Sequence, residues 1–177
     1  MARMGRRVVA TAMVVVGAIL AARDSAAQPS EVHVRSFSPA IVALMQRAGE
    51  RSATFRQLVR TIGQSDSYVY VDEGKCGQDA RACFVTVTKA GPKRIMWVHV
   101  DTRKADWDWD LMGSIGHELR HTIEAIDDAS VTDGRELYRF YEDIGRRRWE
   151  RMRETQAAID AGNSVREEVR KFNRSFP

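Results

Sequence analysis

This sequence is notable first for what it lacks. It has two cysteines in 177 residues, Cys76 and Cys83, and their spacing and number exclude a CxxC redox or zinc motif. It has no internal repeat, no low-complexity segment and only one long apolar run, at residues 8–22. That run is about 15 residues long, shorter than the roughly 18 to 20 needed to span a bilayer. The sequence therefore lacks the patterns of solenoid and membrane-spanning proteins.

The apolar run has the flanks of a cleaved secretory signal. Arg3, Arg6 and Arg7 precede it, and the small residues Ser25-Ala26-Ala27 follow it. We expect a signal peptide at residues 1–27, with an uncleaved anchor as the alternative, and a single domain at residues 28–177 that is secreted or periplasmic and not membrane-bound after cleavage. Because the signal holds four Arg and one Asp, cleavage lowers the net charge from +4 to +1. The basic balance is therefore poor evidence for a nucleic-acid partner.

Local periodicity predicts an α+β fold. Residues 28–38 show no period, and residues 39–62 have apolar positions spaced as in a helix. Three runs rich in β-branched and aromatic residues predict strands at 68–71, 83–88 and 94–100, with a turn at 90–92. Helical patterns follow at 111–126, 133–145 and 147–171. We expect an N-terminal helix, a small three-stranded antiparallel sheet, and three further helices.

The two cysteines flank a polar loop between the first two predicted strands. An even number of cysteines in an exported chain favours a disulfide. We expect a Cys76–Cys83 bridge across a hairpin, which would stabilise the fold by about 2 to 3 kcal/mol in the chain-entropy model.

The first helix after the sheet carries an H-E-x-x-H motif, His117-Glu118-Leu119-Arg120-His121. Residues four apart share one face of a helix, so the two imidazoles can bind one Zn²⁺. Glu118 is rotated by about 100° from His117 and does not coordinate the metal. From that position it can act as a general base on a metal-bound water. Around this helix the two histidines and Glu124 point one way, and the apolar residues point the other. Histidines that were only packed in the core would lie on the apolar stripe, so this pattern favours a site.

At these residues the sequence resembles the zincin superfamily of zinc metallopeptidases. The resemblance covers Ser114 to Ile123 well, although Arg120 is charged where zincins usually have uncharged residues. The metzincin extension is absent, and no histidine follows His121. The resemblance therefore implies a carboxylate third ligand, as in the gluzincin branch.

Several carboxylates follow the motif and are candidates for that ligand. We favour Glu154, because it shares a helical stripe with small and apolar residues that would let its helix approach the motif helix, and a buried carboxylate needs a cation or hydrogen-bond partner. Glu124 is the second choice, although one straight helix would place three ligands almost in a row. Its simpler role is an ion pair with Arg120. The remaining candidates are Asp128, Glu142, Asp143 and Glu150.

The resemblance implies hydrolysis of a peptide or protein substrate by a zinc-activated water, with Glu118 moving the proton. It also implies an edge strand that aligns the substrate, for which residues 94–100 are the candidate. Tyr138 or Tyr141 could stabilise an oxyanion, although such tyrosines are more often packing residues. His99 is more simply a packed strand residue than a ligand.

Two other functions remain open from the sequence. The motif could be structural or degenerate in a non-catalytic exported zinc-binding or protein-binding domain. The arginine-rich segment at residues 146–153 could instead bind an anionic surface. Acidic residues interrupt that segment, and no nucleic-acid-binding motif is present, so a solvated helix face is the simpler interpretation.

Overall fold

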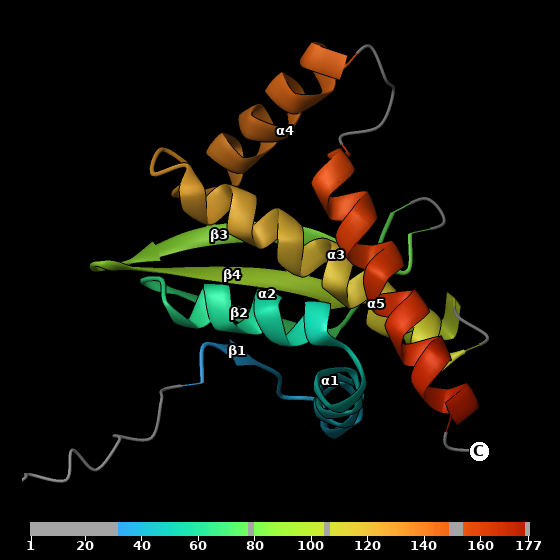
Figure 1. Cartoon of the computed structure of the whole chain (residues 1–177). Helices are drawn as coiled ribbons and strands as arrows, with labels where there is room; N and C mark the ends of the chain where they lie inside the picture. Colours follow the sequence, from blue (N-terminus) through green and yellow to red (C-terminus); the bar gives the residue numbers. More distant parts are fainter. Residues whose placement is uncertain (1–31, 78–79, 105–106, 149–153, 176–177) are drawn as a thin grey trace, which may run out of the picture.

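The computed structural model describes residues 32–77, 80–104, 107–148 and 154–175, with side chains of residues 144–148 left out of the description. The predicted signal peptide and most of the arginine-rich segment lie outside these residues. Within the described ranges, none of the helices is both long and apolar enough to cross a membrane. The described residues form the α+β arrangement of Figure 1, with five α-helices and one sheet.

The sheet has four strands in the order β1-β2-β4-β3. β1 (Val34–Arg35) is parallel to β2 (Ser67–Glu73), and β2 is parallel to β4 (Lys93–Val100). Only β3 (Ala82–Ala90) runs antiparallel, alongside β4. The predicted three-stranded antiparallel sheet is therefore wrong, and the segment at residues 28–38 contributes an unpredicted edge strand.

The path of one loop explains the unexpected strand order. The chain leaves β2, crosses the end of β4 and enters β3 from the far side. The Gly74 amide donates to the Val100 carbonyl at 3.1 Å, and the Asp101 amide donates to the Arg81 carbonyl at 2.8 Å. β3 then turns at Gly91, with φ of 61°, into its hairpin partner β4. β4 consequently fills the space between β2 and β3, a pairing that strand propensity does not encode.

The predicted Cys76–Cys83 disulfide is confirmed, with a Cα–Cα distance of 5.8 Å. It does not bridge a hairpin, because β2 and β3 are not neighbours in the sheet. It instead ties the crossing loop to the start of β3. Disulfides persist in oxidising compartments, so the bridge is consistent with an extracellular protein.

The predicted N-terminal helix is two helices, α1 (Pro39–Arg51) and α2 (Ala53–Gly63). Ser52 separates them with extended backbone angles, φ −128° and ψ 120°, and its hydroxyl accepts the Phe55 amide at 2.9 Å. The same hydroxyl donates to Glu168 at 2.6 Å. The sequence did not show this break, because the buried apolar positions keep helical spacing on both sides of Ser52.

The remaining helices are α3 (Asp108–Asp127), α4 (Gly134–Arg148) and α5 (Gln156–Ser175), preceded by a short 3₁₀ turn, η1 (Thr102–Lys104). α2 and α3 lie on one face of the sheet, and α5 packs along α3 (Figure 1). Inward-facing β4 residues such as Met96 and Val98 pack with Ile115 and Leu119 of α3 in one core. α3 is therefore the central helix of the fold, and it carries the H-E-x-x-H motif.

Candidate metal centre

Both motif histidines lie in the middle of α3, away from the ends of the helix. The side chain of His121 is 3% exposed and that of His117 is 16% exposed. Their rings meet edge to face with centroids 4.8 Å apart, as expected for imidazoles one helical turn apart. α3 is buried on nearly all sides, because the sheet covers its apolar stripe and α5 covers much of the rest.

Glu154 lies against both imidazoles. Its Oε2 is 2.7 Å from His117 Nε2 and 3.3 Å from His121 Nε2. One ligand atom from each of the three residues lies within 4.8 Å of the other two, which makes this a group able to hold a metal ion. The sequence predicted that Glu154 lies within a helix at residues 147–171. In the structure α5 begins at Gln156, so Glu154 lies just before this helix. The structure therefore brings together the three residues predicted as ligands.

Small residues let α3 and α5 approach closely enough to form this cluster. A Cβ added to Gly162 of α5 would lie 3.0 Å from the Cβ of His117 and 3.1 Å from the Gly113 carbonyl oxygen. A Cβ on Gly116 of α3 would lie 2.8 Å from a methyl of Val165. The sequence indicated a close approach from the alanines of α5. The glycines, which matter as much, were missed.

Glu124 holds His121 from the other side of its ring. Its Oε2 is 2.9 Å from His121 Nδ1, while its Oε1 accepts the Thr155 hydroxyl at 2.7 Å. Arg120 Nε lies 3.6 Å from the same carboxylate, the pair that the sequence suggested. Because Glu124 faces Nδ1 and Glu154 faces Nε2, the geometry favours Glu154 over Glu124 as the third ligand. A carboxylate on the outer nitrogen is the usual second partner of a metal-binding histidine.

The carboxylate of Glu118 lies beside the cluster and is held by the sheet. Its Oε2 accepts the backbone amide of Phe84, in β3, at 2.8 Å, and its Oε1 is 4.0 Å from His117 Nε2. Burial raises the pKa of Glu118, although the two histidines oppose that shift. Glu118 therefore lies next to the three candidate ligands without being one of them. Its hydrogen bond to Phe84 depends on the strand order and had no signal in the sequence.

The charge of the cluster depends on whether His121 is protonated. Burial alone would lower the pKa of His121, but hydrogen bonds to Glu124 and Glu154 outweigh it and raise the pKa to about 9. Hydrogen bonds from the two histidines hold the pKa of Glu154 well below its usual range. The proton on His121 Nε2 occupies the same direction in which this nitrogen would bind a metal. Two imidazole nitrogens and one carboxylate oxygen are the donor set of catalytic zinc sites, which leave a fourth position open. The residues present therefore fit zinc.

Of the two tyrosines considered, only Tyr141 reaches the cluster. Its ring meets that of His121 edge to face at 5.4 Å, and burial, reinforced by the nearby glutamates, raises the pKa of its hydroxyl well above the ordinary value. Tyr138 is 49% exposed. His99 lies on β4, with its ring packed over Gly74.

Among the described residues, the other acidic candidates, Asp128, Glu142 and Asp143, do not join this group. Asp128 accepts the Ser130 amide and hydroxyl at 2.9 and 2.7 Å. Among the residues that the structure describes, the only group with metal-binding geometry consists of His117, His121 and Glu154. Glu150 lies outside them.

Comparison of the chain with protein families, curated proteins and solved structures found no match. The geometry of this site is therefore the basis for assigning a function.

Proposed function

We propose that this protein is an exported zinc-dependent metallopeptidase, with His117, His121 and Glu154 as metal ligands and Glu118 as general base. The observation that carries the proposal is the convergence of both motif imidazoles on Glu154, which lies just before α5, at 2.7 and 3.3 Å. Zinc bound there would lower the pKa of a water molecule and polarise the scissile carbonyl. The predicted signal peptide and the disulfide support an oxidising, extracytoplasmic location.

Glu118 has the position that a general base needs. Its Oε1 faces the ligand cluster, and its Oε2 is fixed by the Phe84 amide. Its raised pKa favours taking a proton from the attacking water and passing it to the leaving amine. The buried hydroxyl of Tyr141, protonated at neutral pH, is available as a donor to the oxyanion that forms during attack.

β3 replaces β4 as the strand that would align a peptide substrate. β4 was the sequence-based candidate, but both of its edges are occupied, by β2 and by β3. β3 is the edge strand next to α3, and its Phe84 amide already contacts Glu118. An extended peptide added along β3 would therefore pass the base and the ligand cluster.

A non-catalytic zinc-binding domain is the second candidate. The observation in its favour is the burial of Glu118, which is only 9% exposed. Glu118 can act as a general base only if water reaches the cluster. Glu154, whose side chain is 35% exposed, provides a route for that water and so favours the catalytic candidate.

Metal content and hydrolysis test the two candidates in turn. We would purify residues 28–177 without chelators and measure zinc by mass spectrometry for the parent, His121→Ala and Glu118→Gln, with the exposed Glu167→Gln as the matched control. About one zinc per chain, lost only in His121→Ala, is expected. Hydrolysis of a mixed peptide library should then disappear in Glu118→Gln and survive in Glu167→Gln. Zinc binding without hydrolysis in the parent would favour the non-catalytic domain, and no zinc would refute both.

A further inference from the structure

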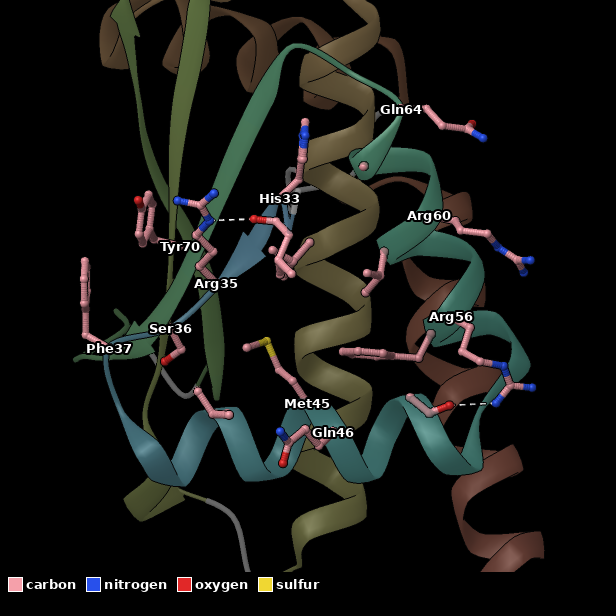
Figure 2. Close-up of a pocket in the computed structure, with 17 residues that line it drawn as sticks. His33, Arg35, Ser36, Phe37, Met45, Gln46, Arg56, Arg60, Gln64 and Tyr70 are labelled. Atoms are coloured by element: carbon pink, nitrogen blue, oxygen red, sulfur yellow. Dashed lines mark hydrogen bonds between the residues drawn. The ribbon is translucent and has the colours of Figure 1, made fainter. Parts of the chain in front are cut away.

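A cavity lies at the opposite edge of the sheet from the metal cluster. β1, α1 and α2 enclose a half-open cavity of about 1160 Å³ (Figure 2). Because β1 and β3 are the two outer strands, the cavity and Glu118 are separated by the width of the sheet. The inference drawn from it does not depend on the proposed peptidase activity.

Apolar side chains form most of the lining. Phe55 and Val34 are buried at its base, and Val42, Met45 and Val59 line its walls. Figure 2 shows the thioether of Met45 pointing into the hollow between β1 and α2. Methionine is flexible and polarisable, so it adapts to apolar ligands of irregular shape. Pockets of this size with mostly apolar walls and a few polar groups are typical of sites for small organic ligands.

The charged residues of the lining are all basic. Arg35, Arg56 and Arg60 line the cavity, and none of the described lining residues is Asp or Glu. Arg35 donates through Nε to the Val32 carbonyl and lies over the Tyr68 ring at 4.7 Å. Arg56 donates to the Gly49 carbonyl at 2.7 Å. Arg60 is exposed at the rim on α2 and, among the described residues, has no hydrogen-bond or ion-pair partner. The rim of an apolar cavity therefore carries one uncommitted arginine. Its guanidinium points outward from α2 in Figure 2, and it would turn toward the mouth of the cavity to meet a ligand.

We propose that this cavity binds an anionic amphiphile, with a single aliphatic chain among Val42, Met45, Phe55 and Val59 and a terminal carboxylate at Arg60. An apolar chain is stabilised by leaving water, at about 25 cal/mol per Å² of apolar surface buried. A guanidinium matches a carboxylate in charge and in fork geometry. One free arginine fits a headgroup with a single negative charge.

A peptide strand is a weaker fit to the same cavity. Strand addition draws its affinity from backbone hydrogen bonds along an edge, and β1 is only two residues long. In the parallel pairing of β1 with β2, the His33 carbonyl faces β2 and accepts the Val69 amide at 2.8 Å. Since backbone groups alternate between edges, Val34 alone would offer its amide and carbonyl to an added strand.

The test is calorimetric titration of residues 28–177 with dodecanoate below its micellar concentration, and with 1-dodecanol as the uncharged analogue. We expect saturable one-to-one binding of dodecanoate and at least fivefold weaker binding of dodecanol. Arg60→Gln should lower the affinity for dodecanoate about fivefold and leave the affinity for dodecanol unchanged. Arg174→Gln, an exposed arginine at the far end of α5, is the matched control and should change neither.

A second variant tests the location of the aliphatic chain. A Cβ added to Gly49 of α1, which lines the cavity, would have no atom within 4 Å, so Gly49→Leu should fold and obstruct the hollow. We expect Gly49→Leu to lower the affinity for both ligands at least tenfold and to leave the zinc content unchanged. Absence of saturable binding, or equal binding by the parent, Arg60→Gln and Gly49→Leu, would overturn the proposal. Binding of an acidic extended peptide but not of dodecanoate would overturn it in favour of a protein partner.

Discussion

Zinc affinity should depend steeply on pH because zinc and a proton compete for one nitrogen. In the metal-free protein, His121 donates Nδ1–H to Glu124 and Nε2–H to Glu154, and its pKa is about 9. Zinc needs the Nε2 lone pair, so binding must release that proton at any pH below about 9. We therefore expect affinity to rise about tenfold from pH 7 to pH 8, and to level off above pH 9.

The stability of the metal-free protein should change with pH in the opposite direction. The folded-state pKa of His121 is raised from 6.5 to about 9, so its ion pairs stabilise the fold fully below pH 6.5. That contribution is lost as pH rises through 9. A shift of this size corresponds to about 3 kcal/mol. Urea unfolding in EDTA should therefore show falling stability from pH 6.5 to 9, and the zinc-loaded protein should not.

Competition with a chromophoric chelator, corrected for the chelator's own protonation, measures the affinity at each pH. Glu124→Gln keeps an acceptor at Nδ1 but removes its charge, so the pH at which affinity levels off should fall, and zinc should bind about 10- to 100-fold more weakly at pH 9. Glu167→Gln, on the exposed side of α5, is the control. An affinity that is flat between pH 7 and 8, or a profile unchanged by Glu124→Gln, would refute this reasoning.

Three further changes test contacts that stabilise the fold or position the site. Gly162→Leu places a side chain against His117 and the Gly113 carbonyl. The overpacking should lower the free energy of unfolding by about 1 to 3 kcal/mol and the zinc affinity at least tenfold. Urea unfolding and chelator competition measure these two quantities. Replacing Cys76 and Cys83 with serine removes the disulfide and should lower the free energy of unfolding, measured in urea, by about 2 to 3 kcal/mol. An unchanged urea midpoint would contradict this. Arg94→Leu leaves four carbonyls near the end of α3 without their donor and should cost about 3 kcal/mol, measured by thermal unfolding.

Local sequence pattern determined most of the elements and the candidate metal ligands of this protein. The 3.6-residue period located the helices, and two imidazoles four residues apart on one helix already imply a shared metal ligand face. Glu154 was identified from the small residues that follow it, and the disulfide from the number and spacing of cysteines. Each of these inferences depends on residues close together in the chain, where backbone geometry alone sets the distances.

Tertiary structure decided what depends on residues far apart. The loop that crosses β4 put β4 inside the sheet and left β3 as the edge beside Glu118. The close packing of α5 on α3 put Glu154 on Nε2 of both histidines, whereas Glu124, three residues after His121 in α3, lies on Nδ1 of His121. The sequence ranked Glu154 above Glu124 but could not place either one on a particular nitrogen, because the approach of Glu154 to Nε2 follows from helix packing and not from spacing along the chain. Strand order likewise follows from the path of a loop and from side-chain packing, which strand propensity does not specify.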